Sequence, residues 1–310
     1  MPEHIIIKPA IAKLFDEFMR QGRVLFLSAP CGFGKTVVAE ALLAGVPEGK
    51  KISRLNAGDP DFSQKNWTEN QSKESTQSRT ADWDVLLIDD LQLMQEEEDW
   101  LPLCELIRIE PQKRFVLLSR GAPPGCLMAF QYAGVMNVLE ADDLLFDRDD
   151  ISKALQLYNV EAGSSVIREI LKASIGYPLG VMITARHMAA GRPFGPEVVA
   201  RSFREVFSYF ESAIYKRFDL PMRRFLLELA PFEQFDLELV RIVSGNSHAG
   251  ELMDQILQTT TMLRYDNVNK FHFWPQFRDF LLWELERECS EEKRKAIFSR
   301  GGLYYELKED

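Results

Sequence analysis

The feature that most constrains the fold of this chain of 310 residues is one short glycine-bearing segment. It reads Ala29-Pro30-Cys31-Gly32-Phe33-Gly34-Lys35-Thr36 and lies between an apolar run at 24–27 and a helical pattern over 36–44. Glycines at this spacing allow a tight turn whose backbone N–H groups converge on an anion, and the N-terminus of the following helix adds to that attraction. The pattern therefore predicts a phosphate-binding loop between a strand and a helix of an α/β fold.

The residue types in this loop suit a nucleotide. Lys35 can reach the β- and γ-phosphates, and the hydroxyl of Thr36 can ligate Mg²⁺. The usual pattern begins with glycine, and the small residue Ala29 stands at that position here. We interpret Cys31 as a small filler of the loop rather than as a thiol sensor. The predicted nucleotide-binding residues of the loop are Pro30, Cys31, Gly32, Phe33, Gly34, Lys35 and Thr36.

Further buried strands are predicted at 51–55, 84–88 and 115–118, with helical stretches between them. Continuous apolar strands that alternate with helices are typical of a parallel sheet covered on both faces. The polar segment 63–82 interrupts this pattern and is interpreted as a surface loop, because it has almost nothing to bury.

Two charged positions follow these strands. Asp89 and Asp90 end the third strand, where carboxylates of such sheets lie beside the phosphate loop. We predict that Asp89 holds Mg²⁺ through water, together with Thr36, and that Asp90 orients the attacking water. Arg120 follows the fourth strand and is predicted to sense the γ-phosphate. With Lys35, these residues form the predicted catalytic set.

From about residue 141 the pattern becomes helical. Helical spacing extends over 142–158, 164–174, 179–190 and 196–218. Two or three further helices (223–229, 236–243 and 249–259) precede two short strands, 262–265 and 270–273, around a turn at 266–269. A helix follows at 275–288. Helices, a β-hairpin and a further helix, in this order, predict a winged-helix domain.

Composition excludes several other classes of protein. The chain has 37 basic and 47 acidic residues, a formal net charge of −10, which disfavours a protein that holds nucleic acid by bulk electrostatics. No apolar run approaches the roughly 20 residues needed to cross a bilayer. The 4 cysteines are widely and irregularly spaced, which disfavours zinc binding and a disulfide framework. We therefore expect a reduced, cytoplasmic chain without a membrane partner.

Together these motifs resemble the signal-transducing NTPases with numerous domains (STAND), and within them the ATPase core of MalT-like, LuxR-family transcriptional activators. The matching segments are the phosphate loop with its initial alanine, residues 54–62, the acidic motif 87–90, residues 118–120 with the prolines at 123–124, and the segments 176–180 and 274–281. The resemblance implies a P-loop domain at 1–145, a helical lid at 146–218, a winged helix at 219–290 and, at 291–310, the start of a helical sensor region. It also implies that Pro178 packs on the adenine.

The resemblance implies a slow ATPase that acts as a switch, with ADP, ATP and Mg²⁺ as ligands. An inducer would act through a sensor region and DNA would bind through a C-terminal domain, both expected outside these residues, and the ATP form could self-associate. One departure concerns the winged-helix histidine that contacts a nucleotide phosphate in relatives, because Trp274 stands at its position. His272 lies two residues earlier on the same strand face and is the candidate replacement, although an ordinary strand histidine is the alternative.

Two rival functions stay open. A P-loop ATPase whose winged helix grips DNA itself, as in origin-recognition-like proteins, would need a basic face, whereas residues 201–310 carry 16 basic and 19 acidic residues by count. A kinase of a nucleotide or sugar would need an acceptor site that no motif indicates.

Overall fold

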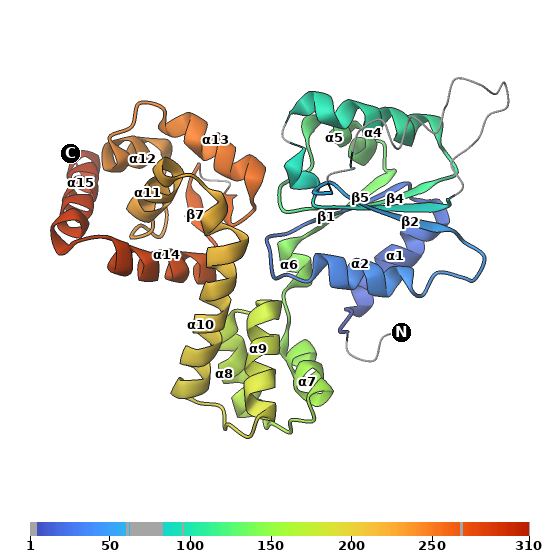
Figure 1. The fold of residues 1–310 in the computed structure, drawn as a ribbon, viewed down its shortest axis with the longest axis horizontal. Helices are drawn as coiled ribbons and strands as arrows, with labels where there is room; N and C mark the ends of the chain where they lie inside the picture. Colours follow the sequence, from blue (N-terminus) through green and yellow to red (C-terminus); the bar gives the residue numbers. More distant parts are fainter. Residues whose placement is uncertain (1–4, 60–61, 63–82, 95, 267–268, 310) are drawn as a thin grey trace. The chain divides into compact units, whose positions relative to one another are not determined.

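The computed structural model of the chain describes residues 5–59, 62, 83–94, 96–266 and 269–309. The chain divides into two compact units, residues 1–194 and 195–310 (Figure 1). The finer division into 1–145, 146–218, 219–290 and 291–310 stays a prediction. The predicted surface loop at 63–82, residues 60–61 of the family-like segment, and residues 267–268 of the predicted turn lie outside the described residues.

The first unit contains a five-stranded parallel sheet with the strand order β2-β3-β4-β1-β5. Its strands are β1 (Val24–Ser28), β2 (Ile52–Asn56), β3 (Val85–Asp89), β4 (Arg114–Ser119) and β5 (Met136–Glu140). The three inner strands β3, β4 and β1 are almost wholly buried, as expected for parallel strands covered on both faces. The predicted α/β fold with a parallel sheet is confirmed.

Helices cover both faces of this sheet. They are α1 (Pro9–Gln21), α2 (Lys35–Leu43), α4 (Glu97–Ile109), α5 (Gly125–Tyr132) and the short α6 (Ala141–Leu144), with a 3₁₀ turn η1 (Leu91–Leu93) after β3. The connection from β1 to β2 runs toward one edge of the sheet and that from β3 to β4 toward the other. Because parallel crossovers are right-handed, α2 and α4 must lie on opposite faces, and Figure 1 shows α1 and α2 on one face and α4 and α5 on the other.

A three-helix cluster completes the first unit. It comprises α7 (Arg148–Leu157), α8 (Ser164–Ser174) and α9 (Pro178–Ala189), packed around buried Ile151, Leu155, Ile170 and Val181. The single helix predicted over 142–158 is two helices, α6 and α7. The break occurs because Asp147 caps the N-terminus of α7, where its side chain accepts hydrogen bonds from the backbone N–H groups of residues 149 and 150.

The second unit has the predicted order of helices, hairpin and helix. Its elements are α10 (Pro196–Ala213), the 3₁₀ turn η2 (Tyr215–Arg217), α11 (Leu220–Leu229), α12 (Leu237–Ser244), α13 (Ala249–Thr259), β6 (Leu263–Tyr265), β7 (Phe271–Phe273), α14 (Pro275–Glu288) and α15 (Glu291–Glu309). β6 and β7 are antiparallel, with Arg264 opposite His272. Among the described residues, each helix is too short or too polar to span a bilayer.

Aromatic rings form much of the core of this second unit. Phe210, Phe277 and Phe280 are buried, and their ring centroids lie 5.7–5.9 Å apart. Such pairs contribute about 0.5–1.5 kcal/mol each beyond the burial of their area. On α15, a Cβ at Gly301 would collide with the ring of Phe232, so glycine allows this helix to approach closely.

Candidate functional site

The loop from residue 29 to residue 36 connects the buried strand β1 to helix α2, as the sequence predicts. Gly32 and Gly34 adopt left-handed φ angles of 79° and 81°, which glycine adopts without steric cost. The two glycines differ in their surroundings. A Cβ at Gly32 would collide with the hydroxyl of Tyr177, whereas a Cβ at Gly34 would meet nothing within 4 Å. Gly32 is therefore required by space as well as by conformation.

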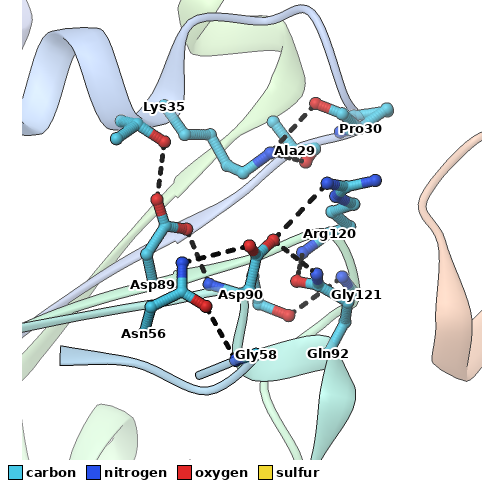
Figure 2. Close-up of polar contacts among 12 residues, drawn as sticks. Ala29, Pro30, Lys35, Asn56, Gly58, Asp89, Asp90, Gln92, Arg120 and Gly121 are labelled. Atoms are coloured by element: carbon cyan, nitrogen blue, oxygen red, sulfur yellow. Dashed lines mark hydrogen bonds and ion pairs between the residues drawn. The ribbon is translucent and has the colours of Figure 1, made fainter. Parts of the chain in front are cut away.

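Lys35 is the first residue of α2, and its side chain is buried beneath the loop. Its Nζ donates hydrogen bonds to the carbonyl oxygens of Ala29 at 2.6 Å and Pro30 at 3.0 Å (Figure 2). Burial lowers the pKa of the ammonium from 10.5 to about 8 because the charged form loses its hydration. The nearby charge of Arg120 lowers this pKa further, whereas the charges of Cys31, Asp89 and Asp90 oppose the shift, Cys31 most strongly.

Thr36 and Asp89 meet directly. The hydroxyl of Thr36 donates to Oδ2 of Asp89 at 2.7 Å, and Oδ1 of Asp89 accepts the backbone N–H of Asp90 at 2.6 Å. A hydroxyl beside a carboxylate suits Mg²⁺, which prefers oxygen ligands. Among the described residues, no group of three His, Cys, Asp or Glu side chains could hold a metal ion. The pair fits a Mg²⁺ ion that would take its remaining ligands from phosphate oxygens and water.

Asp90 lies at the centre of a polar network (Figure 2). Its backbone is left-handed, with φ 57°, and its carboxylate accepts hydrogen bonds from Gln92 Nε2 at 2.8 Å and Asn56 Nδ2 at 3.2 Å. Burial alone would raise the pKa of this carboxyl. The hydrogen bonds, together with the charges of Arg120 and Lys35, outweigh burial and hold the pKa below its usual value.

Arg120 follows β4 and faces Asp90, with 3.5 Å between its guanidinium and Oδ1. The backbone N–H of Arg120 donates to the side-chain oxygen of Gln92 at 3.0 Å. The side-chain amide of Gln92 therefore contacts both Arg120 and Asp90. The hydroxyl of Ser28, at the end of β1, donates to the carbonyl oxygen of Gly121 at 2.9 Å. These bonds fix the segment that carries Arg120 against the strand that leads into the loop.

The three-helix cluster contacts the loop through the segment before α9. Tyr177 is buried, and its hydroxyl donates to the carbonyl oxygen of Cys31 at 3.1 Å. Its ring packs edge-on against Phe33, with centroids 5.2 Å apart. The backbone N–H of Leu179 donates to the carbonyl oxygen of Gly32 at 3.1 Å. Pro178 lies between these two contacts and is buried at the start of α9, so the structure brings it beside the loop.

His272 lies on β7 in the second unit. Arg264 stands opposite it in the hairpin, and the guanidinium of Arg264 lies 4.8 Å from the centre of the Trp274 ring. Burial and the charge of Arg264 lower the pKa of His272, so the ring is mostly neutral at pH 7. Its contact with a nucleotide phosphate stays a prediction.

The structure thus brings together Lys35, Thr36, Asp89, Asp90 and Arg120 at the carboxyl ends of β1, β3 and β4. Three residues that sequence reasoning did not select join them: Asn56, Gln92 and Tyr177. Asn56 ends β2, in the segment noted for its family resemblance, and Tyr177 precedes the predicted proline, so both had a positional signal. Gln92 had none, because its contact with the backbone N–H of Arg120 depends on the order of the strands.

The sequence of residues 211–293 matches the family model of the MalT winged helix domain. The fold resembles the Walker-type ATPase PABY2304 of Pyrococcus abyssi, with 12% identity, 90% of this chain and 97% of that chain covered, and a TM-score of 0.66. The chain combines a P-loop NTPase fold with a MalT-type winged helix. No curated protein sequence matches it.

Two further solved structures resemble this P-loop chain. One is the replication initiator DnaA bound to AMPPCP and single-stranded DNA, with 14% identity, 99% of this chain and 97% of that chain covered, and a TM-score of 0.51. The other is a STAND protein with a tetratricopeptide repeat sensor, PH0952 from Pyrococcus horikoshii. It has 12% identity, 99% of this chain and 46% of that chain covered, and a TM-score of 0.42.

Proposed function

We propose that this chain is an ATP-binding signalling switch of a transcriptional activator, with an ADP-bound resting state and an ATP-bound active state. The observation that carries the proposal is the 2.7 Å contact of Thr36 with Asp89 beneath a glycine-bearing loop at the start of α2. A glycine-bearing turn at a helix N-terminus and a pair of oxygen-bearing side chains lie side by side there. That combination is what a nucleotide with Mg²⁺ requires.

The residues of the site divide the binding between them. Lys35 would carry its ammonium to the β- and γ-phosphates, and the loop N–H groups would hold the phosphate chain. Thr36 and Asp89 would hold Mg²⁺, which neutralises phosphate charge when bound. Pro178 would pack on the adenine, a role supported by the two hydrogen bonds that anchor its neighbours to the loop.

We propose that hydrolysis is slow and that Asp90 and Arg120 take part in it. The carboxylate of Asp90 can accept a hydrogen bond from a water molecule and so orient it. Arg120 would stabilise charge on the γ-phosphate, but it already faces Asp90 at 3.5 Å. A regulatory switch needs no rapid turnover, so these properties suit it.

A switch also requires that the two nucleotides bind the two conformations with different affinity. The contacts of Tyr177 and Leu179 with loop carbonyls offer a route by which the nucleotide would bias the three-helix cluster. We propose that an inducer acts through a sensor region and that DNA binds through a further domain, both outside these residues. ATP-dependent self-association and a cytoplasmic location belong to the same proposal.

The rival function, direct DNA binding by the winged helix, has less support. In such folds a helix normally enters the major groove and presents basic side chains to DNA. Helix α13, which precedes the hairpin, carries Glu251 and Asp254 and no lysine or arginine. Titration of the chain with a DNA duplex at several salt concentrations separates the two functions, and tight, salt-sensitive binding would favour the rival.

Calorimetric titration with ATP and ADP in the presence of Mg²⁺ tests the proposed nucleotide site. We expect Lys35→Ala to weaken both affinities at least about tenfold, because charge-assisted hydrogen bonds contribute about 1.5–3 kcal/mol each. Lys13→Ala, an exposed lysine of α1, is the matched control and should bind as the wild type does. Undiminished affinity in Lys35→Ala would refute the site.

A further inference from the structure

A second concave site lies in the second unit. It is a hollow of about 900 Å³ formed by α11, the turn between α12 and α13, the end of α14 and the first half of α15. This volume falls in the upper part of the range found for small-molecule sites, about 300–1,000 Å³. All of the residues that line it belong to the described part of the second unit, and none belongs to the proposed nucleotide site.

Three cationic side chains that line the hollow have hydrogen-bond donors without a partner among the described residues. Arg224 of α11 and Lys293 of α15 are exposed, and neither side chain has a hydrogen bond or an ion pair with another described residue. Arg300 is 3.5 Å from Glu228, and its Nε has no hydrogen-bond partner in the described part of the chain. Lys293 and Arg300 are seven residues apart, so they share one side of α15 about 10 Å apart along its axis.

The other charged residues of the hollow are already engaged. Arg223 donates to the carbonyl oxygens of Tyr215, Lys216 and Phe218 at 2.7–3.0 Å and so holds η2. Glu228 faces Arg300, and burial raises the pKa of this carboxyl. Glu288 accepts the hydroxyl of Tyr215 at 3.2 Å. The hollow therefore presents a local excess of positive charge on a chain of net charge −10.

We propose that this hollow binds a small organic molecule that carries a phosphate monoester or a comparable dianion. Arg224, Lys293 and Arg300 would hold the dianion, since arginine forks and lysine ammonium groups are the usual partners of phosphate. Ser247 lines the hollow and can hydrogen-bond to a polar body, and the exposed side chain of Leu220 supplies apolar surface. The concave shape favours a small ligand over a duplex, which needs a row of phosphate contacts along an open face.

Phosphorus NMR of ribose 5-phosphate with the full chain tests this site. All samples contain saturating ADP and Mg²⁺, so that the phosphate loop is occupied. Line broadening of the ribose 5-phosphate signal reports weak binding, and we expect Arg224→Gln with Lys293→Gln to weaken that binding at least about tenfold. The control Arg241→Gln with Lys295→Gln removes the same charge from exposed positions outside the hollow and should bind as the wild type does.

Equal affinities in the two double variants, or no binding of ribose 5-phosphate up to about 10 mM, would overturn the proposal. A short DNA duplex is titrated in parallel. Binding of the duplex that depends on Arg224 and Lys293, without binding of ribose 5-phosphate, would also overturn it and assign the hollow to nucleic acid. The same titration in the Lys35→Ala chain separates this site from the loop, because binding to the hollow should persist there.

Discussion

The buried ammonium of Lys35 makes nucleotide binding depend on pH. Its pKa is about 8 in the free chain, because burial disfavours the charged form. A nucleotide phosphate beside Nζ would favour that form and raise the pKa again, so binding above pH 8 must take up a proton. The affinity for the nucleotide should therefore fall as pH rises from 8 to the higher pKa that Lys35 has in the complex.

The size of this effect follows from the titration of one group. A group of pKa 8 is about 90% protonated at pH 7 and about 3% protonated at pH 9.5, so the Kd for ATP should rise about 30-fold between them. Calorimetry at intermediate pH values measures this change in Kd.

Lys35→Arg is the matched control, because arginine keeps its charge throughout this range. We expect it to bind more weakly than the wild type at pH 7 and to change little with pH. A wild-type Kd that stays constant from pH 7 to about 9.5 would refute the proposed role of this ammonium.

Three further predictions concern single residues. Gly34→Ala should lower the free energy of unfolding, measured in urea, by about 1–2 kcal/mol. Gly32→Ala should lower it by clearly more, because the new Cβ also displaces Tyr177. Equal losses in the two variants would contradict this difference between the glycines. Gln92→Ala should lower kcat for ATP hydrolysis about tenfold with little change in KM, and an unchanged kcat would exclude a positioning role. Glu284 is fully buried, and burial raises its pKa from 4.5 to about 7, although Arg287 opposes the shift. The protonated Glu284 therefore stabilises the fold fully below pH 4.5, and this contribution is lost as pH rises through 7. In thermal unfolding, the Tm of Glu284→Gln should rise relative to that of the wild type as pH increases over this range. A Tm difference that does not change with pH would contradict this prediction.

The sequence predicted the part of the site that depends on local pattern. The loop from Ala29 to Thr36 specifies its own conformation, because the positions of Gly32 and Gly34 demand left-handed backbone. The inner strands of the sheet were equally clear, since each is a continuous apolar run bounded by polar residues. The winged helix followed from the order of its elements and the turn between two short strands.

Other elements carried too weak a signal. β5 (Met136–Glu140) is an edge strand in which only two residues are buried, and Asn137 interrupts its apolar run. The break before α7 had a signal, since Asp147 and Asp150 stand at the spacing of a capping box, but the helical periodicity on both sides obscured it. Helical pattern alone therefore joined two helices into one.

The polar network around Asp90 could not be predicted from sequence. Asn56 and Arg120 lie 34 and 30 residues from Asp90, and Gln92 lies 28 residues from Arg120. Their meeting depends on β2, β3 and β4 lying next to one another in the sheet, which no single motif specifies. The contact of Tyr177 with Cys31 likewise joins residues 146 positions apart.

The most direct measurement is the identity and amount of the nucleotide that stays bound to the chain through purification. A resting switch predicts close to one ADP per wild-type chain and almost none in Lys35→Ala. A wild-type chain that carries no nucleotide and takes up neither ATP nor ADP when these are added with Mg²⁺ would contradict the proposed function.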